Sequence, residues 1–143
     1  MEARFALDCV VFVADAGMLS ADNVCRDYVV AARLRSMKAE ELRKVTGAHS
    51  WQATGDGRKV TEVSIGDRRL ILRYCPKRAA KDAHEREQAI KKARKRLASG
   101  VKGSGRNGRY LNVKRGAVKL DAAAIKRDRH LEGLHGVWTS LKA

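Results

Sequence analysis

The stretch that decides the fold is residues 10–20, VVFVADAGMLS, in which a short apolar run ends at an acid. An unbroken apolar run of this length is typical of a strand buried on both faces, as parallel strands of α/β sheets are. Asp15 would then stand at the carboxyl end of the strand, where open α/β sheets bind their ligands. The alternative is a turn, because Asp bonds readily to nearby backbone amides and Gly17 supplies the flexibility that a turn needs.

Outward from this stretch, the pattern predicts a β-α-β unit. A short helix capped by Ser20 should follow, and residues 28–34, YVVAARL, form a second apolar run. The 13 residues from Asp15 to Asp27 are just enough for a crossover between parallel strands. We therefore expect two parallel strands at the start of the chain.

Turn and cap residues divide the chain after residue 34 into further helices and strands. A helix should run from a Ser36 cap to a stop at Gly47. Residues 54–58, TGDGR, predict a loop, and residues 59–75 predict a hairpin that turns at Gly66-Asp67. The further elements that we expect are a long helix over 77–99, two short strands before residue 121, a helix over 121–129 and a last strand over 134–140.

Composition favours a protein of the cytoplasm. The chain has 143 residues, 44% of them hydrophobic, which suits one domain or part of one. We find no run long enough to span a membrane and no secretion signal, so we expect a soluble, cytoplasmic chain without a membrane partner. The three Cys and four His residues are scattered, so neither a disulfide framework nor a zinc site is indicated.

The net charge of +15 is concentrated in one third of the chain. Between Arg68 and Arg115 there are 17 Lys or Arg residues against three acids. Such a local excess is typical of a protein that contacts the phosphate backbone of nucleic acid. A solvated helix face that keeps the protein soluble is the alternative.

Four stretches together resemble the middle of a bacterial insertion-sequence transposase of the DDE type, and they occur in that family's order. They are VVFVADAGMLSADNV, YVVAARL, YCPKRAAKDAHEREQAIKKARKRL and EGLHGVWTS. The resemblance implies an α/β fold with a partial, RNase H-like mixed sheet and a basic β-hairpin/helix insertion. It divides the chain into a partial core over 1–54, a basic insertion over 55–120 and a return to the core over 121–143.

The resemblance also implies an activity and a site. Such transposases cleave and join the phosphodiesters of an insertion element with two divalent ions, Mg²⁺ or Mn²⁺, and Asp15 matches the second catalytic, metal-binding aspartate. The family's first Asp and final Glu have no counterpart here, and Glu132-Gly133 and Thr139-Ser140 replace the usual Asp-Gly and Thr-Asn. We therefore expect a fragment or decayed copy that is inactive alone.

DNA is the expected partner, both as element ends and as target, together with self-association or association with an intact transposase. The residues that we expect to contact DNA are Lys77, Arg78, Lys81, Arg86, Lys91, Lys92, Arg94, Lys95 and Arg96. A non-catalytic, basic DNA-binding remnant and a misfolded pseudogene product are the alternatives to a partial transposase.

Overall fold

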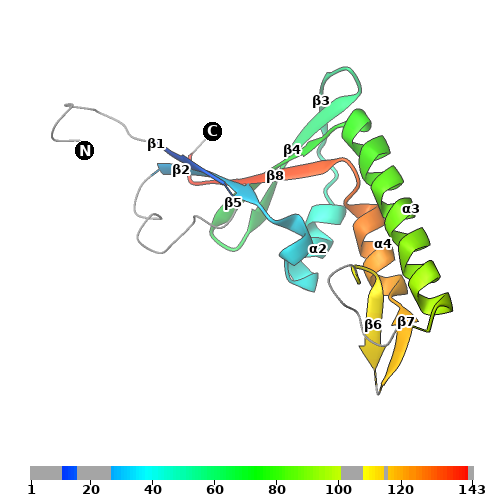
Figure 1. Cartoon of the computed structure of the whole chain (residues 1–143). Helices are drawn as coiled ribbons and strands as arrows, with labels where there is room; N and C mark the ends of the chain where they lie inside the picture. The colour runs from blue at the N-terminus through cyan, green and yellow to red at the C-terminus, as the bar shows by residue number, and fades with distance from the viewer. Residues whose placement is uncertain (1–10, 16–26, 101–107, 115, 142–143) are drawn as a thin grey trace. The chain divides into compact units, whose positions relative to one another are not determined.

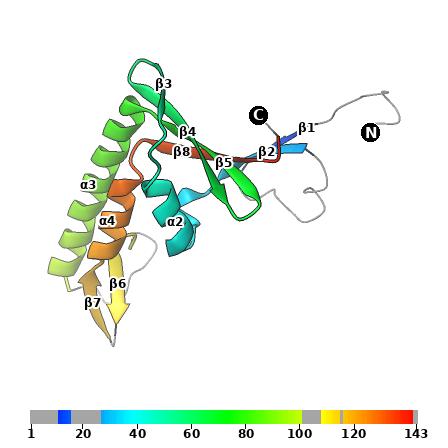
Figure 2. The ribbon, with the colours of Figure 1, turned by 180° about the vertical axis from the view of Figure 1, so that it is seen from behind.

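The computed structural model describes residues 11–15, 27–100, 108–114 and 116–141 (Figures 1 and 2). They belong to two compact units: the sheet unit, residues 1–75 with 134–143, and the basic unit, residues 76–133. The described residues form a mixed α/β structure with largely antiparallel sheets and three α-helices. The expected α/β class is therefore confirmed at this level.

The sheet unit contains a six-stranded sheet in the order β1-β2-β8-β5-β4-β3. Its strands are β1 (Val11–Ala14), β2 (Asp27–Ala32), β3 (Gln52–Gly55), β4 (Arg58–Ile65), β5 (Arg68–Tyr74) and β8 (Leu134–Thr139). The last strand, β8, lies between β2 and β5 and runs antiparallel to both. The chain thus returns to the middle of the sheet after the whole basic unit.

The predicted parallel pair is confirmed, because β1 pairs with β2 in parallel from Val11 opposite Asp27 to Ala14 opposite Val30. The prediction that β1 is buried on both faces is wrong. Val11 is 38% exposed and Val13 is 75% exposed. The physical reason is that Val11 and Val13 point to the same face of the sheet as Val29, and the described residues leave that face largely uncovered. The short helix predicted after Ser20 lies outside the described residues.

One face of the sheet supplies the core of this unit. Val30, Trp138 and Leu70 lie side by side on three neighbouring strands and are all buried. A Cβ atom on Gly136 would lie 3.0 Å from Leu34 Cδ2, so the missing side chain lets Leu34 pack close against β8. The opposite face is apolar but open, since its Val and Ile side chains on β1, β2, β5 and β8 are exposed or half-buried.

Helix α2 (Ala39–Thr46) buries Val45 and ends at Gly47 as predicted. The predicted Ser36 cap is wrong. Ser36 belongs to a single turn of 3₁₀ helix, Leu34–Ser36, and α2 starts after Lys38, whose backbone N–H donates to Glu41 Oε2 at 3.1 Å.

Two tight turns connect the three strands at the other end of the sheet. The hairpin about Gly66-Asp67 is confirmed, with β4 and β5 paired from Lys59–Tyr74 to Ile65–Arg68. The loop predicted over 54–58 is itself a hairpin turn between β3 and β4. Asp56 and Gly57 both have positive φ, 50° and 69°, which is the backbone of the type I′ turn that Asp-Gly favours.

The basic unit contains a long helix, a hairpin and a short helix. They are α3 (Pro76–Ala98), β6 (Leu111–Lys114), β7 (Ala117–Leu120) and α4 (Ala122–His130), all close to the predicted positions. The buried centre consists of Ala93, Tyr110, Leu111 and Ala124. Asp121 caps α4, because its Oδ1 accepts a hydrogen bond from Ala124 N at 2.9 Å.

The units differ from the predicted segments in their boundaries. Residues 55–75 were expected in the insertion, yet β4 and β5 pair with the rest of the large sheet. Residues 121–133 were expected in the core, yet α4 packs within the basic unit. Strand pairing therefore divides the chain at Cys75 and Leu134. Among the described residues, no helix has the length and apolar composition needed to cross a membrane.

Candidate nucleic-acid interface

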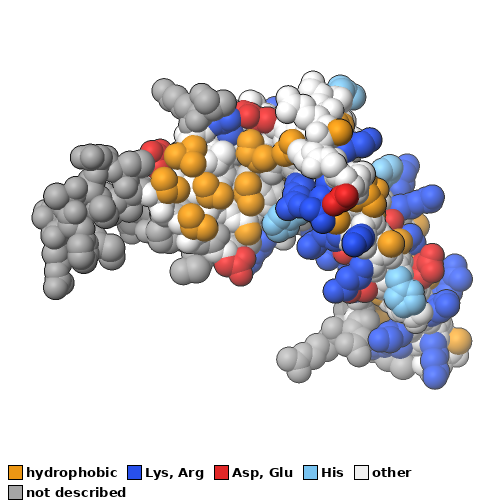
Figure 3. Space-filling view, turned by 90° about the horizontal axis from the view of Figure 1, so that it is seen from above, with side chains coloured by type: hydrophobic (Ala, Val, Ile, Leu, Met, Phe, Trp, Pro, Cys, Tyr) orange, Lys and Arg blue, Asp and Glu red, His pale blue; other side chains and the backbone are white. Residues whose placement is uncertain are grey.

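Helix α3 has one side rich in exposed basic residues and one side that is buried or half-buried. Its side chains Ala79, Ala83, Ile90 and Ala93 are separated by four, seven and three residues and are buried or half-buried. This spacing places them on one face of a helix. Of the nine predicted DNA contacts, seven are exposed on the remaining surface: Lys77, Arg78, Lys81, Lys91, Lys92, Arg94 and Lys95. Figure 3 shows how Lys and Arg side chains gather over this helical part of the chain.

Two of the predicted contacts have a different setting. The Arg86 guanidinium donates a hydrogen bond to Glu132, and the two side chains are only 15% and 18% exposed. The hydrogen bond to the Glu132 carboxylate raises the pKa of Arg86 above its ordinary value, so this charge is held internally. Arg96 is half-buried. Neither side chain is presented outward as the other seven are.

The segment after α4 is tied to α3 by acids. Beside the Arg86–Glu132 pair, Asp82 Oδ2 accepts a hydrogen bond from the backbone N–H of Gly133 at 3.0 Å. Both ties use the half-buried side of α3. They fix the inward face of the helix and thereby determine which bases face outward.

A second tie joins α4 to the start of the β6–β7 hairpin. Asp128 Oδ2 accepts hydrogen bonds from Arg109 Nη2 at 2.6 Å, Arg109 Nε at 3.1 Å and the Tyr110 hydroxyl at 2.9 Å. The Asp128 side chain is 6% exposed, whereas that of Arg109 is 38% exposed. Charge-assisted bonds of this kind are stronger than neutral ones, and they satisfy an acid that would otherwise be costly to bury.

Further exposed bases were missed by the sequence prediction. On α4, Lys126, Arg127 and Arg129 are exposed, and on the hairpin Lys114 and Lys119 are exposed. The signal for α4 was present, because these three bases occur within the predicted helix over 121–129. With them the basic unit has 18 Lys or Arg residues against six acids, which is +12 of the total of +15.

Two of the exposed basic residues of α3 also form i,i+4 ion pairs. Arg78 Nε lies 3.7 Å from Asp82 Oδ2, and Lys81 Nζ lies 3.8 Å from Glu85 Oε1. Exposed pairs of this type contribute little free energy, of the order of 0.3–0.5 kcal/mol on a helix. Such contacts leave both bases available to a phosphate group.

Asp15 lies where the sequence placed it, directly after the last residue of β1 and exposed to solvent. Within the described residues there is no group of three or more His, Cys, Asp or Glu side chains that could hold a metal ion. Hard cations such as Mg²⁺ need several oxygen ligands. The described residues therefore do not by themselves complete a two-ion site around Asp15.

A comparison of the chain with protein-family models, curated proteins and solved structures found no match.

Proposed function

We propose that the basic unit binds the phosphate backbone of double-stranded DNA. The observation that carries this proposal is that seven Lys and Arg side chains are exposed on one side of α3. Hydrogen bonds to Glu132 and Asp82 hold the opposite side of the helix inward. From Lys77 to Lys95 the helix rises by about 27 Å at 1.5 Å per residue. That length corresponds to about eight base pairs of duplex at 3.4 Å each.

The side chains of α3 are better suited to contact DNA phosphates than to read nucleotide bases. Lys and Arg contact phosphates without regard to sequence, whereas adenine is read by Asn or Gln. Gln88 is the one amide side chain in α3. We expect sequence-tolerant binding with a dissociation constant of about 10⁻⁴ to 10⁻⁶ M at physiological salt.

The test removes four charges from α3 and four from the sheet unit. The first variant replaces Lys91, Lys92, Arg94 and Lys95 by Gln. Its matched control replaces Arg43, Lys44, Lys59 and Arg73 by Gln, all of which are exposed in the sheet unit. Fluorescence anisotropy on three duplexes of unrelated sequence should show the α3 variant weakened by about 10- to 100-fold on each, because several phosphate contacts are lost.

The control should bind all three duplexes nearly as the unmodified chain does. An equal loss of affinity in both variants would show that the exposed residues of α3 act only through net charge and that this side of α3 is a solvated face. A loss of affinity for one duplex alone would show that α3 reads sequence.

A wider proposal is that the chain is part of a DDE transposase with an RNase H-like core. It is supported by the sequence resemblance and by the position of Asp15 after the first of two parallel strands. In this proposal Asp15 is one of the acids that bind Mg²⁺ or Mn²⁺. The competing proposal is a DNA-binding remnant without catalysis, which the charge of the basic unit supports equally.

We expect the chain alone to cut no DNA, because one carboxylate is too few for a two-ion site. Supercoiled plasmid incubated with the chain in Mg²⁺ or Mn²⁺ should be nicked no faster than with Asp15→Ala. Nicking that disappears in the Asp15→Ala variant would contradict this expectation and favour the enzyme over the remnant.

A further inference from the structure

Strand β4 has an edge that is paired along only part of its length. It pairs with β5 from Lys59 to Ile65, but with β3 only from Arg58 to Val60. The residues just before β3 bond to one another instead, because Trp51 donates from its backbone N–H to His49 O at 3.0 Å and from Nε1 to Ala48 O at 2.9 Å. From residue 61 onward, the described part of the chain leaves this edge of β4 without a neighbouring strand.

The register shows which backbone groups face the open edge. A two-residue turn at Gly66-Asp67 is closed by the pair Ile65 and Arg68, so Ile65 hydrogen-bonds toward β5. Alternate residues of a strand bond to opposite neighbours. The N–H and C=O groups of Glu62 and Ser64 therefore point to the open edge.

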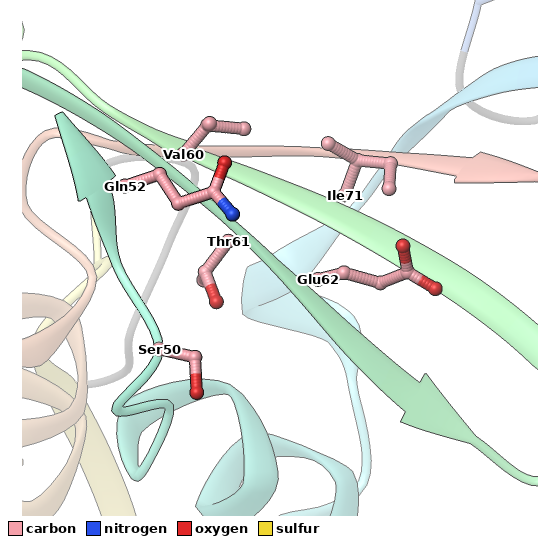
Figure 4. A pocket seen from close by; sticks show the side chains of 6 residues that line it. All are labelled: Ser50, Gln52, Val60, Thr61, Glu62 and Ile71. Atoms are coloured by element: carbon pink, nitrogen blue, oxygen red, sulfur yellow. The ribbon is translucent and has the colours of Figure 1, made fainter. Parts of the chain in front are cut away.

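A pocket of about 290 Å³ adjoins this edge. Its lining residues are Ser50, Gln52, Val60, Thr61, Glu62 and Ile71 (Figure 4). Thr61 is only 5% exposed, and its hydroxyl has no hydrogen-bond partner among the described residues. Figure 4 shows this hydroxyl directed toward Ser50, where β3 departs from β4. Buried hydroxyls normally have a partner, so the pocket offers a polar contact that a ligand could satisfy.

The acid at the pocket, Glu62, is already paired with an arginine. Arg69 donates two hydrogen bonds to Glu62, from Nε to Oε1 at 2.6 Å and from Nη2 to Oε2 at 2.7 Å. The hydrogen bond from Arg69 lowers the pKa of Glu62, so the carboxylate stays ionised and paired near neutral pH. The remaining polar groups of the pocket, on Ser50, Gln52 and Thr61, are uncharged and suit an uncharged polar group.

We propose that this edge and pocket bind an extended peptide of another protein, which adds to β4 as a further strand. The backbone of the peptide pairs with Glu62 and Ser64, and one amide or hydroxyl side chain enters the pocket and hydrogen-bonds Thr61. Strand addition of this kind takes its affinity from backbone hydrogen bonds and its specificity from side-chain pockets. A second copy of the chain is a poorer occupant, because a net charge of +15 opposes self-association.

The test uses the full chain and an uncharged probe, the acetylated and amidated peptide Ser-Thr-Val-Gln-Val-Thr-Ser. Binding is followed by the NMR shifts of the backbone amides of the protein, and the shifts should be largest at Glu62 and Ser64. The same peptide with N-methyl groups on alternate amides keeps its side chains but loses its edge hydrogen bonds. It should bind at least tenfold more weakly.

Two protein variants form a matched pair at the edge. Ser64→Pro removes an N–H that points to the open edge and spares the ladder to β5, whereas Ser64→Ala keeps the N–H. We expect Ser64→Pro to lose at least tenfold in affinity and Ser64→Ala to bind as the unmodified chain does. Thr61→Val should weaken the Gln peptide by about three- to tenfold and leave a peptide with Ala in place of Gln unaffected.

Equal binding by Ser64→Pro and Ser64→Ala, or by the methylated and unmethylated peptides, would overturn the proposal. The comparison of the methylated and unmethylated peptides uses the unmodified protein, so it tests the proposal even if Ser64→Pro folds poorly. Sedimentation of the protein without peptide tests whether a second copy occupies the edge. A dimer that is present in the unmodified chain and lost in Ser64→Pro would show that it does, and would also overturn the proposal.

Discussion

The sheet unit and the basic unit are stabilised in different ways. Large apolar side chains fill the core of the sheet unit, among them Leu70, Leu72 and Trp138. The basic unit has a smaller buried centre around Ala93 and Tyr110, and hydrogen-bonded acids supplement it. Four of its six acids, Asp82, Asp121, Asp128 and Glu132, bond within the unit.

This difference explains how a segment of 58 residues folds with a charge of +12. Like charges at close range destabilise a compact state. In the basic unit four of the six acids make internal hydrogen bonds, and most basic side chains are exposed to water, which screens them. The arrangement that holds the unit together is therefore the same one that leaves its outer surface positive.

The largest expected effect is a loss of stability confined to the sheet unit. Leu70 is fully buried between Val63 and Trp138, so Leu70→Ala should cost about 3–4 kcal/mol of unfolding free energy through lost burial and a cavity. Val13→Ala is the control, because this side chain is 75% exposed, and it should change stability by less than about 0.5 kcal/mol.

Hydrogen exchange distinguishes the two units in this experiment. In Leu70→Ala, protection should fall in β5 and β8 and persist in α3, because α3 packs on a separate buried centre. An equal loss in α3 would show that the two units unfold together.

A smaller effect is expected from the internal acid of the basic unit. Asp128→Ala removes three hydrogen bonds and leaves the Tyr110 hydroxyl buried without this acceptor, at a cost of about 3 kcal/mol. Glu87→Ala removes the same charge from an exposed position of α3 and should cost little. Hydrogen exchange in α4 should show the loss in the first variant only. Similar behaviour of both variants would mean that these acids act only through net charge.

Local patterns predicted most of the elements, because they depend on neighbouring residues. The hairpin at Gly66-Asp67, helix α3 and strand β8 all follow from turn residues or periodicity. Strand β3 was not foreseen, because Gln52–Gly55 is exposed throughout and carries no apolar pattern. The central position of β8 was not foreseen either, because its partners lie far away along the chain.

The candidate site was predicted in composition but not in orientation. The basic residues of α3 were identified from charge alone, yet their outward or inward position depends on contacts made elsewhere. Arg86 is the clearest case, since its partner Glu132 lies 46 residues further along the chain. The open edge of β4 was likewise invisible, because it results from where β3 stops pairing.

The most direct test of the account is the salt dependence of DNA binding by the unmodified chain and the two four-fold Gln variants. Each phosphate contact contributes about 0.9 to the slope of log affinity against log salt concentration. Replacing Lys91, Lys92, Arg94 and Lys95 should therefore reduce the magnitude of the slope by about 3 to 4. The control at Arg43, Lys44, Lys59 and Arg73 should keep the slope of the unmodified chain. A control that flattens the slope as much as the α3 variant does, or an α3 variant that leaves it unchanged, would contradict the claim that the outer side of α3 binds DNA.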